Sequence, residues 1–451
     1  MQEGGDVTDI NDGRTPVAVP EEARRAGEAE APARSYAEPS VWTERMLTTL
    51  AEGVKGGKWY SLMDKVHAER TLRAAFARVK ANKGSSGVDH VTVEMFEAEL
   101  DDNLRRLSEG LRTDEYRPQA IRRHYIPKAG SAEKRPLGIP TVRDRVVQTA
   151  LRMVLEPIFE RDFATHSYGF RPGRGCKDAL RRVDELLKDG AVFVVDADLK
   201  SYFDTIPHEH LLAEVGRKVS DGKIMKLLGQ FLQQGILDGL QAWTPEEGTP
   251  QGAVISPLLS NIYLDPLDHV MAGEGFEMVR YADDFVVLCR SEAQAAQALA
   301  VIADWTAQAG LVLHPDKTQR IDARMQSFEF LGYRFANGRR WPRNKSLTKF
   351  KDAVRAKTRR TAGRSLRAII DHLNPRLRGW FIYFQHSYRT TFPSLDGWIR
   401  SRLRSVLRAH RGMRGIVRRT DRQRWTNAFF AEHGLYSLQR AHALACQPPR
   451  G

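Results

Sequence analysis

The chain has 451 residues and a net charge of +14, and 41% of its residues are hydrophobic. This length suffices for roughly two to four domains with cores of their own. An excess of Lys and Arg in a folded protein suits a polyanionic partner, and nucleic acid is the first to consider. The three cysteines lie far apart with no CxxC pair, which argues against a disulfide framework and a cysteine-rich zinc site.

Export and membrane insertion are not expected either. No apolar run approaches the ~18 residues of a membrane span, and the N-terminus lacks the basic-then-apolar order of a signal peptide. Few cysteines also fit a reducing compartment. We therefore expect a cytoplasmic protein with no membrane partner.

Taken in chain order, residues 1–40 come first and are rich in Gly, Pro, Ala and Glu. They hold nine Asp or Glu against four Arg, a composition typical of a disordered acidic tail. Order is expected to begin near Trp42. Helical spacing follows in Leu72, Phe76 and Val79, and the loop NKGSSG interrupts it before a second helical stretch.

Residues 116–140 read as short strands around a hairpin loop, and 142–162 as a helix. A second region then alternates strands and helices, which we lay out as a helix-backed antiparallel sheet of ferredoxin-like type. Its expected elements are a strand at 191–199, helices at 209–219, 223–235 and 256–271, a hairpin around 283–284, a helix at 292–310 and a strand at 311–314. From about residue 345, Arg and Lys recur through helical segments that LNP and FPSLDG are expected to break.

This layout places several carboxylates at the ends of its two central strands. Asp196 and Asp198 alternate on one face of the first strand, and Asp283 and Asp284 lie between two β-rich stretches in EMVRYADDFVVL. An isolated Asp pair could simply close a hairpin. Clustered carboxylates repel unless a cation neutralises them, and oxygen donors without His or Cys suit Mg²⁺. Two Mg²⁺ roughly 3.5 to 4 Å apart form the known clamp for in-line phosphoryl transfer.

Several longer motifs occur in a fixed order around these carboxylates. RPLGIPTVRDRVVQTAL, DLKSYFDTIPH, GTPQGAVISPLLSNIYLD and YADD together resemble the motif blocks of reverse transcriptases. NKGSSGVDHVT, SYGFRPGRG, HPDKTQ, FLGY and LNPRLRGWFIYF narrow the resemblance to the group II intron-encoded reverse transcriptase/maturase family. It covers roughly residues 70–440. With Cys446 as the one cysteine of its C-terminal part, the chain resembles the bacterial type that lacks a Cys/His-rich endonuclease domain.

The resemblance implies an α+β fold shaped as a right-hand polymerase. An N-terminal extension and fingers would occupy residues 41–185, and a ferredoxin-like palm with the catalytic carboxylates 186–335. An all-helical, basic thumb that doubles as the maturase domain would occupy 345–445. The family motif usually has Gly where Ser201 stands here, and both residues are small.

The same resemblance assigns catalytic residues. Asp198, Asp283 and Asp284 match the carboxylates that hold two Mg²⁺ ions, and Asp196 is better read as their neighbour on the strand. Lys317 matches a lysine near the leaving pyrophosphate that can act as its proton donor. An exposed lysine at a strand end is the alternative for Lys317.

Four further residues match the nucleotide-binding positions of the family. Lys128 and Arg135 match fingers cations that hold the triphosphate. Phe203 matches the ring that packs under the sugar and crowds a 2′-hydroxyl, and Gln251 matches a residue that lines the pocket. The alternatives are solvated surface charges, ordinary core packing and a polar loop.

The thumb region interleaves cations with aromatic residues, which suits structured RNA. Its competing interpretation is that the aromatic residues form core and the cations a solvated face. The residues concerned are the cations Lys349, Lys351, Arg376 and Arg378 and the aromatic residues Trp380, Phe381, Tyr383 and Phe384.

The sequence therefore predicts an RNA-directed DNA polymerase that binds its own group II intron RNA and assists splicing and mobility. Its partners would be the intron RNA, an RNA template with a DNA primer, dNTPs and a DNA target. Alternatives are a retron-like or diversity-generating reverse transcriptase and a splicing-only RNA-binding maturase. The basic region with LNPRLRGW argues against the first, and the intact carboxylates argue against the second.

Overall fold

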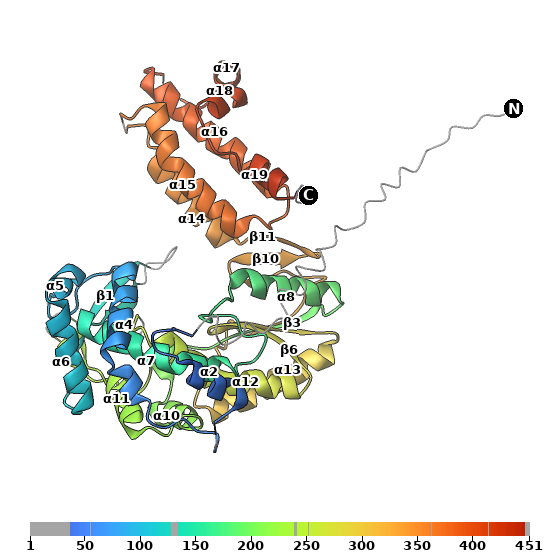
Figure 1. The fold of residues 1–451 in the computed structure, drawn as a ribbon. Coiled ribbons are helices and arrows are strands. Elements are labelled where there is room, and N and C mark those ends of the chain that lie inside the picture. The colour runs from blue at the N-terminus through green and yellow to red at the C-terminus, as the bar shows by residue number, and fades with distance from the viewer. Residues whose placement is uncertain are drawn as a thin grey trace.

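A computed structural model describes residues 37–54, 56–127, 134–238, 241–250, 252–361, 363–413 and 415–446. The predicted acidic tail up to residue 36 lies outside these ranges, as do Lys128 and Gln251. The chain forms two sheet-containing parts side by side, with a helical region standing above them (Figure 1). Among the described residues, no helix is both long and apolar enough to cross a membrane.

The N-terminal helices pack around one buried helix. They are α2 (Glu44–Glu52), α3 (Met63–Val66), α4 (Glu69–Asn82), α5 (Val93–Ala98) and α6 (Leu100–Arg112). The buried helix is α7 (Val142–Glu160), which starts where the Thr141 side chain accepts a hydrogen bond from the Asp144 amide. The predicted helical face of Leu72, Phe76 and Val79 is confirmed, because all three are buried in α4. Trp42 is also buried, and its Nε1 donates to the Met153 carbonyl at 3.0 Å.

A four-stranded fingers sheet follows, with strand order β2-β1-β4-β5. Its strands are β1 (Ile121–Pro127), β2 (Lys134–Ile139), β4 (Ile236–Asp238) and β5 (Gln241–Trp243). The predicted hairpin at 116–140 is confirmed as the antiparallel β1–β2 pair. β4 adds to β1 in the parallel direction, so a segment from far along the chain completes this sheet.

The palm sheet has the order β6-β7-β3-β8, with every neighbouring pair antiparallel. Its strands are β3 (Phe193–Asp198), β6 (Glu277–Tyr281), β7 (Asp284–Cys289) and β8 (Gln319–Asp322). The helices of this part are α8 (Cys176–Lys188), α9 (Tyr202–Thr205), α10 (His208–Gly216), α11 (Gly222–Leu232), α12 (Ser256–Gly273) and α13 (Glu292–Gln308). This order is that of a ferredoxin-like sheet, as predicted.

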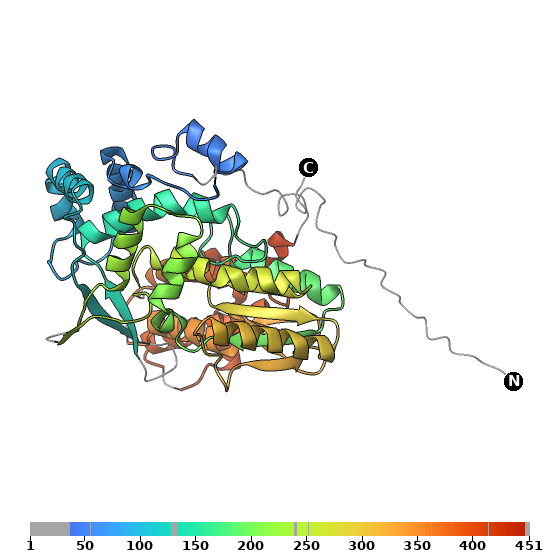
Figure 2. The ribbon, with the colours of Figure 1, turned by 90° about the horizontal axis from the view of Figure 1, so that it is seen from below.

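The two faces of the palm sheet bury alternate residues of each strand. Val195 and Val287 belong to the core that α12 and α13 share, while Val194 and Val286 belong to a second core under α8. In Figure 2, the view from below, α12 and α13 lie in front of the sheet. Residues of β3 that lie an even number of positions from Val194 therefore face the α8 side of the sheet.

The predicted strand at 311–314 is wrong. Only Leu313 forms a bridge there, to Leu199 just past the end of β3. The chain turns at 315–317, so this segment is too short to build a ladder. β8 takes the place beside β3 instead.

A small sheet leads from the palm into the helical region. Its strands are β9 (Phe328–Phe330), β10 (Tyr333–Ala336) and β11 (Arg339–Pro342), in the order β11-β10-β9. Phe328 and Phe335 stack with ring centroids 4.9 Å apart. Both belong to the core under α8 together with Phe384 of the helical region. This small sheet therefore joins the palm sheet to the helical region (Figure 1).

The helical region has a core of its own. Its helices are α14 (Asn344–Lys357), α15 (Leu366–Phe384), α16 (Thr391–His410), α17 (Arg419–Arg424), α18 (Asn427–Glu432) and α19 (Leu438–Ala445). Both predicted helix breaks are wrong, because Pro375 lies inside α15 and Pro393 is the third residue of α16. A proline costs little in a first turn, where its missing N–H has no intrahelical partner. In α15, burial of Leu373 and Leu377 outweighs the lost hydrogen bond.

The loop that contains Gly169 docks against β6. The Tyr168 amide donates to the Arg280 carbonyl at 2.8 Å, and a Cβ at Gly169 would lie 2.2 Å from the Ala282 nitrogen. That approach is closer than any real side chain makes.

Gly169→Ala should therefore lower the free energy of unfolding by about 1–3 kcal/mol, as overpacking does. Gly379→Ala is the matched control, because Gly379 lies inside α15 with nothing within 4 Å of the added Cβ. The control should gain about 0.5–1 kcal/mol from higher helix propensity. Chemical denaturation of both variants measures this, and equal effects would contradict the close approach.

Candidate active site

The predicted carboxylates meet at the ends of β3 and β7. The antiparallel register places Asp198 directly opposite Asp284, and Asp283 precedes Asp284 in the turn from β6. Asp196 and Asp198 lie two and four residues after Val194 in β3, and Asp284 lies two residues before Val286 in β7. Each aspartate therefore faces the same side of the sheet as that valine. Asp196, Asp198 and Asp284 therefore lie on the α8 side of the sheet.

The electrostatics of this edge show how crowded the negative charge is. Although Asp284 is solvent-exposed, partial desolvation by the surrounding protein raises its pKa to about 7, and the nearby carboxylates of Asp196, Asp283 and Asp198 raise this pKa further. Burial also raises the pKa of Asp196 to about 6, against the effect of its hydrogen bond with Gln319. Both shifts disfavour the charged carboxylate, and a bound cation would offset this effect.

Lys317 lies beside this group, as predicted. Its Nζ is 2.7 Å from Asp198 Oδ2, in an ion pair with both side chains largely exposed. The His314 amide donates to the Asp198 carbonyl at 2.7 Å, which attaches the segment carrying Lys317 to the end of β3. The role of Lys317 as a proton donor stays a prediction.

The residues at this edge fit Mg²⁺ by their chemistry, because all the donors are carboxylate oxygens. Within the described part of the chain, no three His, Cys, Asp or Glu side chains are grouped closely enough to form a ready-made metal centre. The carboxylate of Asp198 is turned to Lys317, and like charges repel one another. The assignment of Asp198, Asp283 and Asp284 as ligands remains a prediction.

The predicted nucleotide-binding residues come from adjoining elements. Phe203 lies half-buried in α9, and its carbonyl accepts from the Thr249 amide at 2.6 Å. A Cβ at Gly248 would lie 2.8 Å from the Phe203 carbonyl oxygen of α9, and one at Gly252 would lie 2.4 Å from the Gly138 carbonyl oxygen of β2. Arg135 is a residue of β2, paired with Ile126 of β1. Lys128 and Gln251 lie outside the described residues, and the roles of all four residues stay predictions.

Ser201 explains one feature of the motif DLKSYFD. Its φ of 52° lies in the left-handed region, just before α9. Gly adopts this conformation without cost, while other residues are strained there. The backbone at Ser201 is therefore one that a glycine would adopt without strain.

The predicted RNA-binding cations lie on different sides of the helical region. Arg376 and Arg378 are exposed on α15, but residues two apart do not face the same way on a helix. Arg378 lies over the Tyr436 ring at 5.6 Å, whereas Lys351 of α14 lies over the Trp398 ring at 5.9 Å. Lys349 is also exposed on α14.

The aromatic residues of α15 are mostly core. Phe381 and Phe384 are buried, and Trp380 stacks on Phe350 with ring centroids 4.5 Å apart. Tyr383 is half-buried, and its hydroxyl donates to the Leu331 carbonyl at 2.7 Å. The interpretation of these rings as packing is therefore confirmed, and exposed cations remain for binding RNA.

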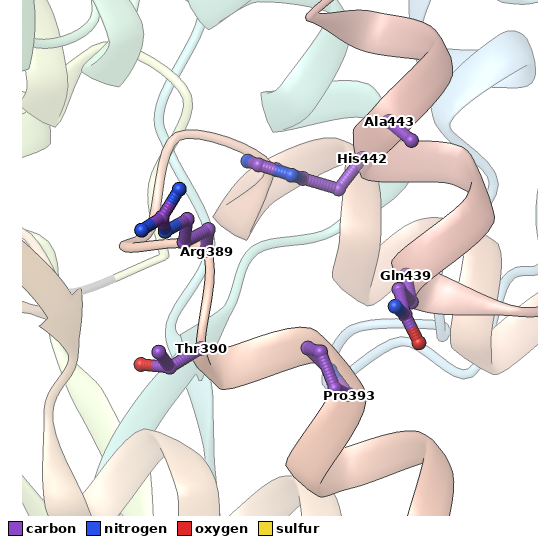
Figure 3. Close-up of a pocket in the computed structure, with 6 residues that line it drawn as sticks. All are labelled: Arg389, Thr390, Pro393, Gln439, His442 and Ala443. Atoms are coloured by element: carbon purple, nitrogen blue, oxygen red, sulfur yellow. The ribbon is translucent and has the colours of Figure 1, made fainter. Parts of the chain in front are cut away.

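A separate pocket of about 350 Å³ opens in the helical region. In Figure 3, the His442 ring extends from α19 toward the loop that carries Arg389. The ring also stacks on Phe392, and burial lowers the pKa of His442. The pocket is lined by Arg389, Thr390, Pro393, Gln439, His442 and Ala443. None of these lies at the carboxylates, so this pocket is no part of the candidate active site.

One set of residues was missed at the sequence level. Arg280 follows the buried Met278 and Val279 in β6, is itself fully buried, and pairs with Asp268 of α12. The signal was present in EMVRY, because a charged residue in a buried strand requires a partner. Its partner could not be found from the sequence, since Asp268 lies on a helix twelve residues earlier.

Two family profiles match the chain in succession. Residues 126–335 match "Reverse transcriptase (RNA-dependent DNA polymerase)", and residues 347–425 match "Group II intron, maturase-specific domain". The chain therefore combines a match to a reverse transcriptase domain with a match to a maturase-specific domain, the pairing expected from its resemblance to group II intron-encoded reverse transcriptase/maturases. The first profile spans the fingers sheet, the palm sheet and β9–β10, and the second lies within the helical region.

Two curated relatives share about two fifths of the aligned residues with this chain. The chain is 41% identical over 228 residues to protein YkfC of Escherichia coli K12, across 47% of this chain and 60% of that protein. It is 40% identical over 196 residues to the group II intron-encoded protein LtrA of Lactococcus lactis, across 43% of this chain and 32% of that protein. The alignments thus span less than two thirds of these relatives. A solved chain titled "Partial Cas6-RT-Cas1--Cas2 complex" is similar at 24% identity and a TM-score of 0.36, over 55% of this chain and 41% of that chain.

If the carboxylates hold Mg²⁺, the metal should stabilise the fold. At free Mg²⁺ about 100-fold above its Kd, the gain for one site is about 2.7 kcal/mol. Asp283→Asn should lose most of this gain, because it removes one ligand charge. Thermal melts with Mg²⁺ and with a chelator measure it.

Asp322→Asn is the control for this experiment. Asp322 is a carboxylate of β8 that pairs with Arg324, so the control removes a charge from the same sheet at another place. It should keep the Mg²⁺-dependent gain. An equal gain in Asp283→Asn and the wild type would contradict a metal at the end of β7.

Proposed function

We propose that this protein is an RNA-directed DNA polymerase of a group II intron that also binds the intron RNA and assists its splicing and mobility. The observation that carries the proposal is the meeting of Asp198 and Asp284 across β3 and β7, with Asp283 in the adjoining turn. This meeting occurs inside a reverse transcriptase domain that a maturase-specific domain follows. The substrates would be dNTPs and an RNA template with a DNA primer, and a DNA target would receive the intron.

The polymerase reaction would take place at the carboxylate edge. Two Mg²⁺ ions held by Asp198, Asp283 and Asp284 would activate the primer 3′-hydroxyl and neutralise charge on the triphosphate. Lys128 and Arg135 of the fingers would bind the triphosphate, and Gln251 would line the base and sugar pocket. Phe203 would pack under the sugar. Lys317, beside Asp198, would donate a proton to the leaving pyrophosphate.

RNA binding would use the exposed cations of the helical region. Lys349, Arg376 and Arg378 are exposed, and most aromatic rings between them are buried. Phosphate contacts of this kind give affinity that falls as salt rises. Splicing assistance needs a surface that stabilises folded RNA, since the ribozyme supplies its own chemistry.

Two observations separate this proposal from its alternatives. The match to the maturase-specific domain favours an intron protein over a retron-like or diversity-generating reverse transcriptase. Desolvation and, after it, the neighbouring carboxylates raise the pKa of Asp284 to about 7, and this grouping of negative charge is unfavourable for a scaffold without a cation. A splicing-only maturase has no use for that arrangement, so the polymerase activity is favoured.

Phe203 should act as the sugar gate. Phe203→Val removes bulk beneath the sugar, so the variant should incorporate ribonucleotides about 10-fold or more better relative to dNTPs. Phe193→Val is the control, because Phe193 is a half-buried ring at the opposite end of β3. Single-nucleotide extension with matched rNTP and dNTP measures the ratio. An unchanged ratio in an active Phe203→Val variant would make Phe203 ordinary core.

The two activities should separate by mutation. Asp283→Ala with Asp284→Ala should abolish cDNA synthesis and preserve splicing at low Mg²⁺. Arg376→Ala with Arg378→Ala should weaken intron affinity and lower its salt dependence, with extension on a simple primer-template retained. Splicing and extension are measured on the same preparations.

A matched charge control is available for the arginine pair. Arg105 and Arg112 are exposed on α6, where each pairs with a carboxylate of the same helix. Arg105→Ala with Arg112→Ala removes the same charge and should leave intron affinity unchanged. A folded Asp283→Ala, Asp284→Ala protein that fails to splice would refute the division of labour between the carboxylates and the helical region.

A further inference from the structure

Arg280 forms a buried ion pair beneath the turn that carries Asp283. It is the fourth residue of β6, and its side chain is fully buried. Nε donates to the two carboxylate oxygens of Asp268 at 2.8 and 2.9 Å, and Nη2 donates to the same carboxylate. Replacing a buried pair by apolar residues is often neutral for stability. Stability alone therefore gives no reason for an arginine at this place.

The third nitrogen of the guanidinium links α12 to the turn. Nη1 donates to Asn261 Oδ1 and to the Ala282 carbonyl, both at 3.0 Å. Asn261 precedes Asp268 by two helical turns, so both project from one face of α12. The Asn261 amide in turn donates to the Gly169 carbonyl at 2.8 Å. Every nitrogen of the Arg280 side chain is thus in use.

The residue held in this way is the one before Asp283. Ala282 is buried and has a φ of 60°, a left-handed conformation that costs a non-glycine residue free energy. The backbone of Gly169 also packs directly on the Ala282 nitrogen. Such a backbone persists only where its surroundings enforce it, and here the hydrogen bond from Arg280 and the packing of Gly169 do so.

We propose that Arg280 is a positioning residue of the polymerase site. Its guanidinium, oriented by Asp268 and Asn261, fixes the Ala282 carbonyl and thereby the place of Asp283 at the end of the turn. This inference rests on the proposed function and deepens it. α12 begins at Ser256, four residues after Gly252, which packs against Gly138 of β2, so the helix that holds Arg280 also starts close to the fingers sheet.

Arg280→Lys is the decisive variant. A lysine keeps a positive charge for Asp268 but has no planar fork that can reach Asn261 and Ala282 as well. The turn should then shift while the buried charge stays paired. Because a misplacement of about 1 Å can cost about 100-fold, kcat for primer extension should fall about 10- to 100-fold, with KM for dNTP within about twofold.

Two readouts of the same variant need no turnover. Hydrogen exchange of the peptide 277–289, measured in a chelator, should be faster in Arg280→Lys because the turn has lost a constraint. Mn²⁺ binding, followed by electron paramagnetic resonance, should be weaker because Asp283 is no longer held in place. A merely structural ion pair would move neither quantity.

Arg408→Lys is the matched control. Arg408 is a buried arginine of α16, and its Nη1 lies 2.7 Å from Asp421 of α17. The same substitution in the same kind of pair should lower the melting temperature. It should leave the exchange of 277–289, Mn²⁺ affinity and kcat at their wild-type values.

Each outcome decides the proposal. It is overturned if Arg280→Lys behaves as Arg408→Lys does, with lower stability and unchanged exchange, Mn²⁺ affinity and kcat per folded molecule. If Arg280→Lys does not fold, Asn261→Ala replaces it, because this variant keeps the pair with Asp268. Unchanged exchange and Mn²⁺ affinity in Asn261→Ala then overturn the proposal. A wild type without primer extension refutes the proposed function, and the exchange of 277–289 still tests the role of Arg280.

Discussion

Negative charge concentrated at the end of two paired strands is the constraint on which the palm depends. The antiparallel register of β3 and β7 sets Asp198 against Asp284, so two like charges face each other at the ends of these strands. Such an arrangement is unfavourable in itself. It persists because both strands are fixed by apolar side chains on the two faces of the sheet, under α8 and over α12 and α13.

Two cations lie close to this concentration of negative charge. Lys317 forms an exposed ion pair with Asp198. Arg280 is buried below the turn, and Asp268 neutralises its charge. The two cations therefore act differently. An exposed lysine can leave its partner when another cation or a phosphate arrives, while a buried arginine with all its nitrogens in use cannot.

Much of this arrangement could be predicted from the sequence, because the spacing of apolar residues indicates which segments are strands and which are helices. The ferredoxin-like order and the meeting of Asp198 with the YADD turn followed from the sequence of elements. The strand predicted at 311–314 failed, since a short apolar run does not reveal that the chain turns right after it. The break predicted at Pro375 failed because the burial of Leu373 and Leu377, a tertiary effect, outweighs local propensity. The link from Arg280 to Asp268 depends on how α12 lies across the sheet, which no local pattern records.

The shared core beneath α8 attaches the base of the helical region rigidly to the palm sheet. Val194 and Val286 of the palm sheet pack in one cluster with Phe335 of the small sheet and Phe384 of α15. A swing of the whole helical region would have to pull these rings out of an apolar interior, at a large cost in exposed area. If α14–α19 bind RNA as proposed, the shared core holds that RNA at a nearly constant distance from the carboxylates. Under the proposed function, room for a long template–primer duplex would then have to come from bending further along the helices or from movement of the fingers.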